Sequence, residues 1–326
     1  MALEGISLPL RSVLAVGEAM RRLVSAQLDI TPFPGEGNTF ERWRVLAAVA
    51  ARDLCLAKIY EGHTDALAIL HELGAPPLPG VWAVWAAESP QNRVVFHPSG
   101  NGGAVRGRKS WCSGARIADY ALITVWTDER ERVLVRVAMN APGISIDSSG
   151  WQAVGMAASA SETVDFQDTP AVPIDQRGEY LSRPGFWQGG AGIAAVWYGA
   201  AAAIAETLAA SSGPSRDPHA AAHLGAIDIA LSSSRSLLRE AAAWIDAHPS
   251  EDASAWALRV RGSVESVAEQ VLQKTGRALG PTPQCRDARH AHLCSDLPIF
   301  LRQSHAEHDL AALGESAARD RPSWAL

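Results

Sequence analysis

Histidines occur in close pairs whose spacing could hold a metal ion. Two imidazoles one helical turn apart are typical of zinc sites such as H-E-x-x-H, where the carboxylate between the two histidines acts as the general base. No carboxylate completes such a motif here, so we expect no metal site. A Ser-His-Asp hydrolase is not indicated either, because no G-x-S-x-G turn follows a strand. The histidine pairs are His219 with His223, His290 with His292, and His305 with His308.

The chain has four cysteines, Cys55, Cys112, Cys285 and Cys294. None of them stands in a C-x-x-C pair, so neither a zinc site nor a disulfide framework is indicated. Free thiols are the rule in a reducing compartment, and we therefore expect a cytoplasmic protein.

Charge and hydropathy exclude two kinds of partner. The 326 residues carry a net charge of −6 and scattered Lys and Arg, so the basic patch of a nucleic-acid-binding protein is not expected. No apolar stretch has the ~18 to 20 residues of a membrane span. The Ala-rich segment 190–210 comes closest, but Glu206 interrupts it, and we predict a packed internal helix. No signal peptide is recognised.

Helical periodicity marks both ends of the chain. Residues 40–73 repeat apolar side chains at three- and four-residue steps, with a second helix expected from about His63, and residues 8–28 could form one more helix. Gly74 and the prolines after it end this region. After Pro173, helical patterns return with short breaks, which is typical of an antiparallel bundle. They cover residues 190–210, 219–248, 253–279 and 297–313.

Short strands fill the middle of the chain. β-branched and aromatic runs alternate with polar turns, and no helix lies between them, so an antiparallel barrel or sandwich is predicted. The runs are residues 81–85, 93–96, 105–111, 120–127, 133–139, 144–146 and 163–166.

Several strings in this middle part share their order and spacing with one family. Gly107-Arg108-Lys109-Ser110-Trp111-Cys112-Ser113-Gly114-Ala115 resembles the G-x-K-x-W-x-[ST]-x-[GA] strand of the acyl-CoA dehydrogenases. Pro142-Gly143-Ile144 resembles their PGV/PGI turn, and residues 155–173 resemble their G-x-x-x-S segment with the strand that follows. The resemblance covers roughly residues 81–175. It implies an α+β fold with N-terminal helices (1–80), a central antiparallel β-domain (81–178) and a C-terminal four-helix bundle (179–326).

The same resemblance implies FAD as the cofactor. A flavin needs a flat apolar wall against its ring, which Trp111 can supply, and hydrogen-bond donors near N5, which the Ser113 hydroxyl can supply. The implied contacts to the cofactor are Trp85, Glu88, Trp111, Cys112 and Ser113. The family's glycine-rich pyrophosphate contact is altered here, because Pro281 removes a backbone donor.

The family's glutamate base has no clear counterpart. That base removes an α-proton from an acyl thioester, and counting from Asp296 places its position on Ser304. His305 or Glu307 could take the role if the alignment shifts, and a solvated face is the alternative reading of this stretch.

Two functions are therefore expected. The first is a flavin-dependent oxidoreductase acting on an acyl thioester or a biosynthetic intermediate, either as a dehydrogenase or as a monooxygenase whose base is Ser or His. The second is a catalytically inactive relative that serves as a binding or scaffolding subunit. A homodimer or homotetramer follows from the resemblance, with neither nucleic acid nor membrane as a partner.

Overall fold

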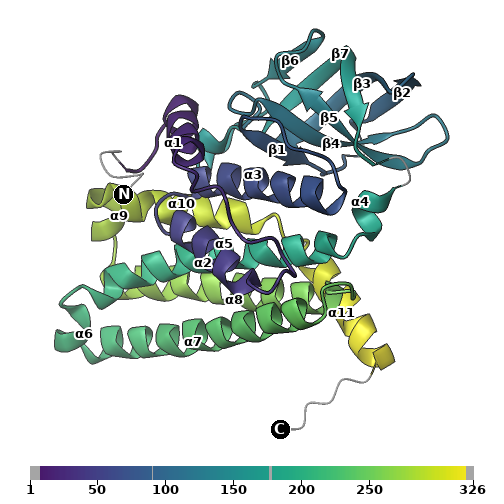
Figure 1. The fold of residues 1–326 in the computed structure, drawn as a ribbon. Coiled ribbons are helices and arrows are strands. Elements are labelled where there is room, and N and C mark those ends of the chain that lie inside the picture. Colours follow the sequence, from purple (N-terminus) through teal and green to yellow (C-terminus); the bar gives the residue numbers. More distant parts are fainter. Residues whose placement is uncertain (1–7, 90, 176–177, 321–326) are drawn as a thin grey trace. The chain divides into compact units, whose positions relative to one another are not determined.

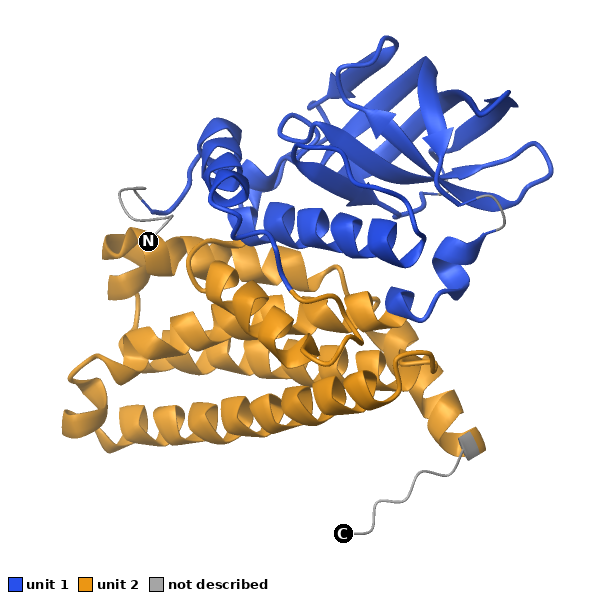
Figure 2. Cartoon of the chain, viewed as in Figure 1, with its two compact units in different colours: residues 1–31, 55–186 blue, residues 32–54, 187–326 orange. Residues whose placement is uncertain are grey.

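Two compact units make up the chain in the computed structural model, which describes residues 8–89, 91–175 and 178–320. One unit consists of residues 1–31 and 55–186, and the other of residues 32–54 and 187–326 (Figure 2). Each unit thus joins a piece of the N-terminal helical region to a later part of the chain. The division at residues 80 and 178 stays a prediction, and residues 1–7 and 321–326 of its outer domains lie outside the described residues.

The strands of the first unit close into a barrel. Strand β4 pairs with β2, β2 with β3, β3 with β7, β7 with β5, and β5 again with β4. Strand β1 adds to β4, and β6 adds to β7. The strands are β1 (Trp82–Trp85), β2 (Val94–Ser99), β3 (Gly102–Cys112), β4 (Tyr120–Trp126), β5 (Arg132–Ala138), β6 (Ile144–Asp147) and β7 (Glu162–Pro173).

The sheet is mixed, whereas the sequence predicted an antiparallel one. Strand β1 runs parallel to β4, with Trp82 opposite Tyr120, and β2 meets β4 in a parallel pair at Val95 and Trp126. Parallel neighbours need a crossover connection. The β2–β3 hairpin and the loop at 113–119 supply that crossover, which short turn signals alone do not reveal.

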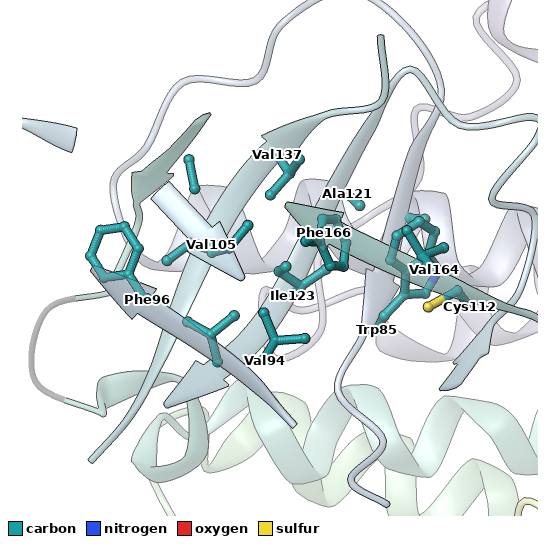
Figure 3. Close-up of a cluster of buried hydrophobic side chains, with 14 of the residues drawn as sticks. Trp85, Val94, Phe96, Val105, Cys112, Ala121, Ile123, Val137, Val164 and Phe166 are labelled. Carbon is teal, nitrogen blue, oxygen red and sulfur yellow. The ribbon is translucent and has the colours of Figure 1, made fainter. Parts of the chain in front are cut away.

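Apolar side chains from every wall fill the barrel. Val105, Ile123, Val137 and Phe166 are almost completely buried and lie among the side chains that Figure 3 draws. Each such side chain contributes about 1.5–3 kcal/mol when it leaves water. This core holds the ends of β1 and β3 in fixed positions.

Helix α3 (Leu54–Glu72) covers the outside of the barrel wall in the same unit (Figure 1). Its residues Ala66, Ile69 and Leu70 pack with Trp82 and Leu122 in a second apolar cluster. The unit also contains α1 (Val13–Ser25) and α4 (Glu179–Ser182).

The helical region at 40–73 breaks earlier than the sequence predicted. Helix α2 (Thr39–Ala50) ends before a turn at 51–52, and α3 begins at Leu54 rather than near His63. Asp53 stands directly before α3, and aspartate is among the residues favoured at a helix N-cap. The apolar repeat continues across this turn, which conceals the break.

Long helices form the second unit. Helix α7 packs along α8, and α8 also contacts α10. Helix α2 lies close against α5, since a Cβ added at Gly199 would be 2.1 Å from the carbonyl oxygen of Ala47. The helices are α5 (Gly185–Ala209), α6 (Gly213–Arg216), α7 (Pro218–Ala247), α8 (Ser254–Leu279), α9 (Thr282–Arg286), α10 (Ala288–Leu301) and α11 (Glu307–Asp320).

The last predicted helix, 297–313, is two helices. Helix α10 ends at Leu301 and α11 starts at Glu307. Between them Ala306 has a φ of 47°, in the left-handed region that a right-handed helix cannot include. The break therefore follows from backbone geometry that an apolar repeat does not report.

Helix α5 is, among the described residues, the one helix long and apolar enough to cross a membrane. However, 78% of its most apolar window is buried inside the protein. The expectation that no apolar stretch reaches the length of a membrane span is therefore wrong for this helix by length and composition, while its burial agrees with the predicted packed internal helix.

Candidate flavin-binding surface

Strand β3 turns Trp111 outward at its end. The pairing of β3 with β7 shifts register between Lys109 and Cys112, and Trp111 within this bulge has a φ of 65°. A β-bulge breaks the two-residue alternation and redirects a side chain. Lys109 and Cys112 therefore point inward, while Trp111 is 60% exposed. A large aromatic face is thus presented on the surface of the barrel.

A glycine shapes the same strand further back. A Cβ added at Gly107 would lie 2.0 Å from the carbonyl oxygen of Arg93, and its φ is 130°. No other residue can take this conformation next to that carbonyl. The first residue of the G-x-K-x-W string is therefore required by the barrel itself.

Two residues beyond Trp111, Ser113 begins a row of hydroxyl groups. The Ser113 Oγ lies 2.6 Å from the Ser161 Oγ, which lies 3.2 Å from the Ser159 Oγ. The Ser159 hydroxyl donates to the carbonyl oxygen of Met156 at 2.8 Å. The predicted site residues did not include Ser159 and Ser161. The matched segment 155–173 contained both, but serines in such a segment are commonly turn formers.

Trp85 lies directly behind this surface. It is 2% exposed, and its indole Nε1 donates to the carbonyl oxygen of Ser113 at 3.1 Å. The structure thus brings together Trp85 and Ser113, which are far apart in the sequence. Trp85 supports the strand end from the core, so its ring does not form part of the exposed surface.

Cys112 points into the barrel core. Its side chain is fully buried, and its thiol donates to the carbonyl oxygen of Lys109 at 3.2 Å. Burial raises the pKa of this thiol to about 12. Of the predicted cofactor contacts, Cys112 can therefore offer a ligand only its backbone.

Glu88 belongs to a polar cluster at the edge of the barrel. Its carboxylate accepts from the Thr124 hydroxyl at 2.8 Å and from the Trp126 indole at 3.1 Å. The buried Lys109 ammonium donates to the Thr124 carbonyl at 2.9 Å and lies 3.5 Å from Glu88. Burial lowers the pKa of Lys109, and the charge of Glu88 opposes that shift. These contacts hold the chain just after β1.

A small hollow borders Ser113 on the side of α3. Lys58 on its rim pairs with Glu61, with the Nζ and Oε2 atoms 3.0 Å apart. Both side chains are largely buried. The hollow is lined by Lys58, Ile59, Gly62, Trp82, Ala83, Val84, Ser113, Gly114 and Ala118.

The predicted base candidates lie around the α10–α11 break in the second unit. The Ser304 side chain is buried, and its hydroxyl oxygen accepts from the Ala306 amide at 3.1 Å. His305 is exposed, and its Nδ1 lies 3.4 Å from Asp309. Glu307 is exposed in the first turn of α11. Of the three, His305 alone carries an imidazole ring, and that ring is exposed.

The histidine and cysteine side chains form no metal centre in the part of the chain that the structure describes. His290 instead contacts the Thr207 hydroxyl through Nδ1 at 3.0 Å and the Cys294 thiol through Nε2 at 3.4 Å. Burial lowers the pKa of His290 and raises that of Cys294 to about 11. These groups therefore stay neutral at physiological pH.

Comparison with known proteins identifies the fold. No protein-family model matches the sequence, and the comparison with curated proteins found no match. KijD3, solved in complex with FMN and dTDP-3-amino-2,3,6-trideoxy-4-keto-3-methyl-D-glucose, superposes with a TM-score of 0.78 at 18% identity, covering 94% of this chain and 87% of that chain. FMN-bound TdsC from Paenibacillus gives 0.77 at 13% identity, covering 91% and 89%. Methanesulfinate monooxygenase MsuC from Pseudomonas fluorescens gives 0.77 at 17% identity, covering 95% and 94%.

At these identities the likeness concerns the fold. Along the chain, helices precede and follow the β-barrel, and this mixture of helix and sheet agrees with the acyl-CoA dehydrogenase-like fold that the sequence motifs predicted.

Proposed function

We propose that this chain is a flavin-dependent oxidoreductase of the acyl-CoA dehydrogenase superfamily that works as a monooxygenase on a small molecule. The observation that carries the proposal is the exposed Trp111, turned outward by a bulge beside the Ser113 hydroxyl. A flat aromatic side chain beside a hydrogen-bonding hydroxyl provides the two contacts that a flavin ring requires, one against its face and one at its edge. The fold adds support, because KijD3 and TdsC of the same fold were solved with FMN.

FMN is the better candidate for the cofactor. The sequence resemblance implied FAD, but the neighbours that support a flavin carry FMN. The proline at 281, in the segment that resembles the pyrophosphate contact, also favours the mononucleotide.

Monooxygenation is favoured over acyl-CoA dehydrogenation for two reasons. The position of the family's glutamate holds Ser304, whose hydroxyl already accepts a loop amide. TdsC and MsuC are, in addition, both named as monooxygenases. A bound flavin supplies two-electron chemistry and reactivity with oxygen. Ser304, His305 and Glu307 stay candidates for proton transfer, and His305 is the first to test.

Flavin titration tests this proposal. The purified chain is titrated without oxygen with FMN and FAD, each oxidised and reduced, and binding is followed by absorption and fluorescence. We expect FMN to bind, and Trp111→Ala to weaken it by about tenfold or more because the stacking surface is lost.

Trp256→Ala is the matched control, since Trp256 is a half-buried tryptophan of α8 in the other unit. It should leave flavin affinity unchanged. If neither flavin binds in either redox state, the proposal is wrong and the inactive scaffolding subunit becomes the better reading.

A further inference from the structure

The hydroxyl groups of Ser113, Ser161 and Ser159 have a fixed hydrogen-bond direction. A carbonyl oxygen only accepts, so the single Ser159 proton is used on Met156. In the contact between Ser159 and Ser161, Ser161 must then be the donor. Because the Ser161 proton is then engaged with Ser159, the Ser161 hydroxyl can only accept a hydrogen bond from the Ser113 hydroxyl, and the two oxygens are 2.6 Å apart. The row therefore runs from Ser113 through Ser161 and Ser159 to the Met156 carbonyl.

The end of this row is held rigidly. Met156 and Ala160 both have left-handed backbones, with φ of 60° and 42°, on either side of the 3-10 turn at 157–159. Strained non-glycine positions of this kind persist where the surroundings fix them and are often found at functional sites. The Gly114 amide donates to the Ser159 carbonyl at 2.9 Å, which ties the turn to the end of β3. Ser159 itself is 1% exposed, so water does not compete for its hydroxyl.

We infer that Ser161 and Ser159 are positioning residues that turn the Ser113 hydroxyl into a hydrogen-bond acceptor and thereby make the site prefer reduced flavin. The inference rests on the proposed function, with the Ser113 hydroxyl taken at the N5 edge of the ring, as the family resemblance implies. Oxidised flavin has a bare N5 that accepts a hydrogen bond, whereas reduced flavin carries an N5–H that donates one. With its proton committed to Ser161, Ser113 suits the reduced form. The sequence-based expectation that Ser113 donates to N5 is thereby reversed.

The test compares dissociation constants for oxidised and reduced FMN, measured without oxygen, in the wild type and Ser161→Ala. Removing the Ser161 hydroxyl frees the Ser113 proton. The Ser113 hydroxyl can then donate to N5 of oxidised flavin or accept from N5–H of reduced flavin. We expect the ratio of the oxidised to the reduced constant to fall about tenfold, mainly through tighter binding of oxidised FMN. Tenfold in this ratio corresponds to about 30 mV in the midpoint potential of the bound two-electron couple, which falls in the variant.

Further variants separate positioning from general damage. Ser159→Ala should lower the ratio in the same direction, because Ser161 is then free to donate to Ser113. Ser161→Thr keeps the hydroxyl and should restore the wild-type ratio. Ser263→Ala is the control. It removes a similar contact in the other unit, where the hydroxyl oxygens of Ser263 and Ser234 are 3.0 Å apart, and it should leave the ratio of dissociation constants unchanged.

The outcomes distinguish the two proposals. If the wild type binds neither form of FMN, the proposed function fails and the inference falls with it. If FMN binds but Ser161→Ala changes the ratio less than twofold in a folded protein, the inference is wrong while the proposed function stands.

Discussion

The indole nitrogen of Trp85 and the carbonyl oxygen of Ser113 are 3.1 Å apart, which joins the end of β1 to the loop that leaves β3. The bond is made from inside the barrel, where Trp85 is almost fully buried. The conformation of the surface at Trp111 and Ser113 thus depends on a residue that a ligand on that surface would not touch.

Trp85→Phe should weaken flavin binding several-fold and lower the free energy of unfolding by about 1–3 kcal/mol. The substitution leaves the Ser113 carbonyl without its partner and removes part of a buried ring. Flavin titration and urea unfolding measure the two effects. In Trp82→Phe, a matched indole-to-carbonyl bond to Leu78 is lost at the start of β1. Trp82→Phe should lower the free energy of unfolding by a similar amount but weaken flavin binding less than Trp85→Phe does. Equal losses of flavin affinity in the two variants would contradict the prediction.

The four thiols should react in a fixed order with a disulfide reagent at pH 8. Cys285 is exposed and should react first. Cys294 should be slow because burial raises its pKa to about 11, and the thiolate is the reactive form. Cys112 and Cys55 are buried and should react only in denaturant. Peptide mapping by mass spectrometry identifies each site, and Cys285→Ser should abolish the fast phase. Fast labelling of Cys112 in the folded protein would mean that its thiol reaches the surface.

His63 should be a neutral, structural histidine. Its Nδ1 accepts from the Trp82 amide at 3.0 Å, so the ring proton is on Nε2, 3.0 Å from Asp29. His63→Ala should cost about 2–4 kcal/mol in urea unfolding, since a buried amide and a carboxylate both lose their partner. Asp29→Asn keeps an accepting oxygen and should cost less. The exposed His71 of the same helix gives the control, His71→Ala, and equal costs at both histidines would contradict this role.

The sequence predicted the order of helices and strands because apolar periodicity follows burial, and burial governs most of the elements found. It did not predict the break before Leu54, because the turn there keeps the same apolar repeat as the helices on either side. The parallel pairing of β1 with β4 was also missed, since pairing partners depend on contacts far apart in the sequence.

For the candidate site, the motif located the correct strand but not the direction of each side chain. Period-two alternation along β3 would place Lys109 and Trp111 on one face, but the bulge buries Lys109 and exposes Trp111. The same bulge takes Cys112 into the core. Ser159 and Ser161 acquire a role only because β7 runs beside β3, a relationship that spacing along the chain does not contain.

Lys109 should make the free energy of unfolding depend on pH in the alkaline range. Burial lowers the pKa of its ammonium in the folded state below the ordinary value of 10.5, so the unfolded chain binds the proton more readily. Between the lowered pKa and about 10.5 the unfolded state then holds more protons, and stability rises with pH across that window. Below the window the lysine is charged in both states, and the full cost of burying that charge is present.

Lys109→Met should remove this rise. Urea midpoints of the wild type and the variant, measured from pH 7 to pH 10.5, give the contribution of Lys109 as their difference, because the other titrating groups are common to both. That difference should grow in favour of the wild type as the pH increases. Lys274→Met, at a half-buried lysine of α8, should leave the pH profile parallel to the wild type. A difference that stays constant or shrinks with pH would show that the Lys109 ammonium keeps its charge through the contacts with Thr124 and Glu88, against the effect of burial.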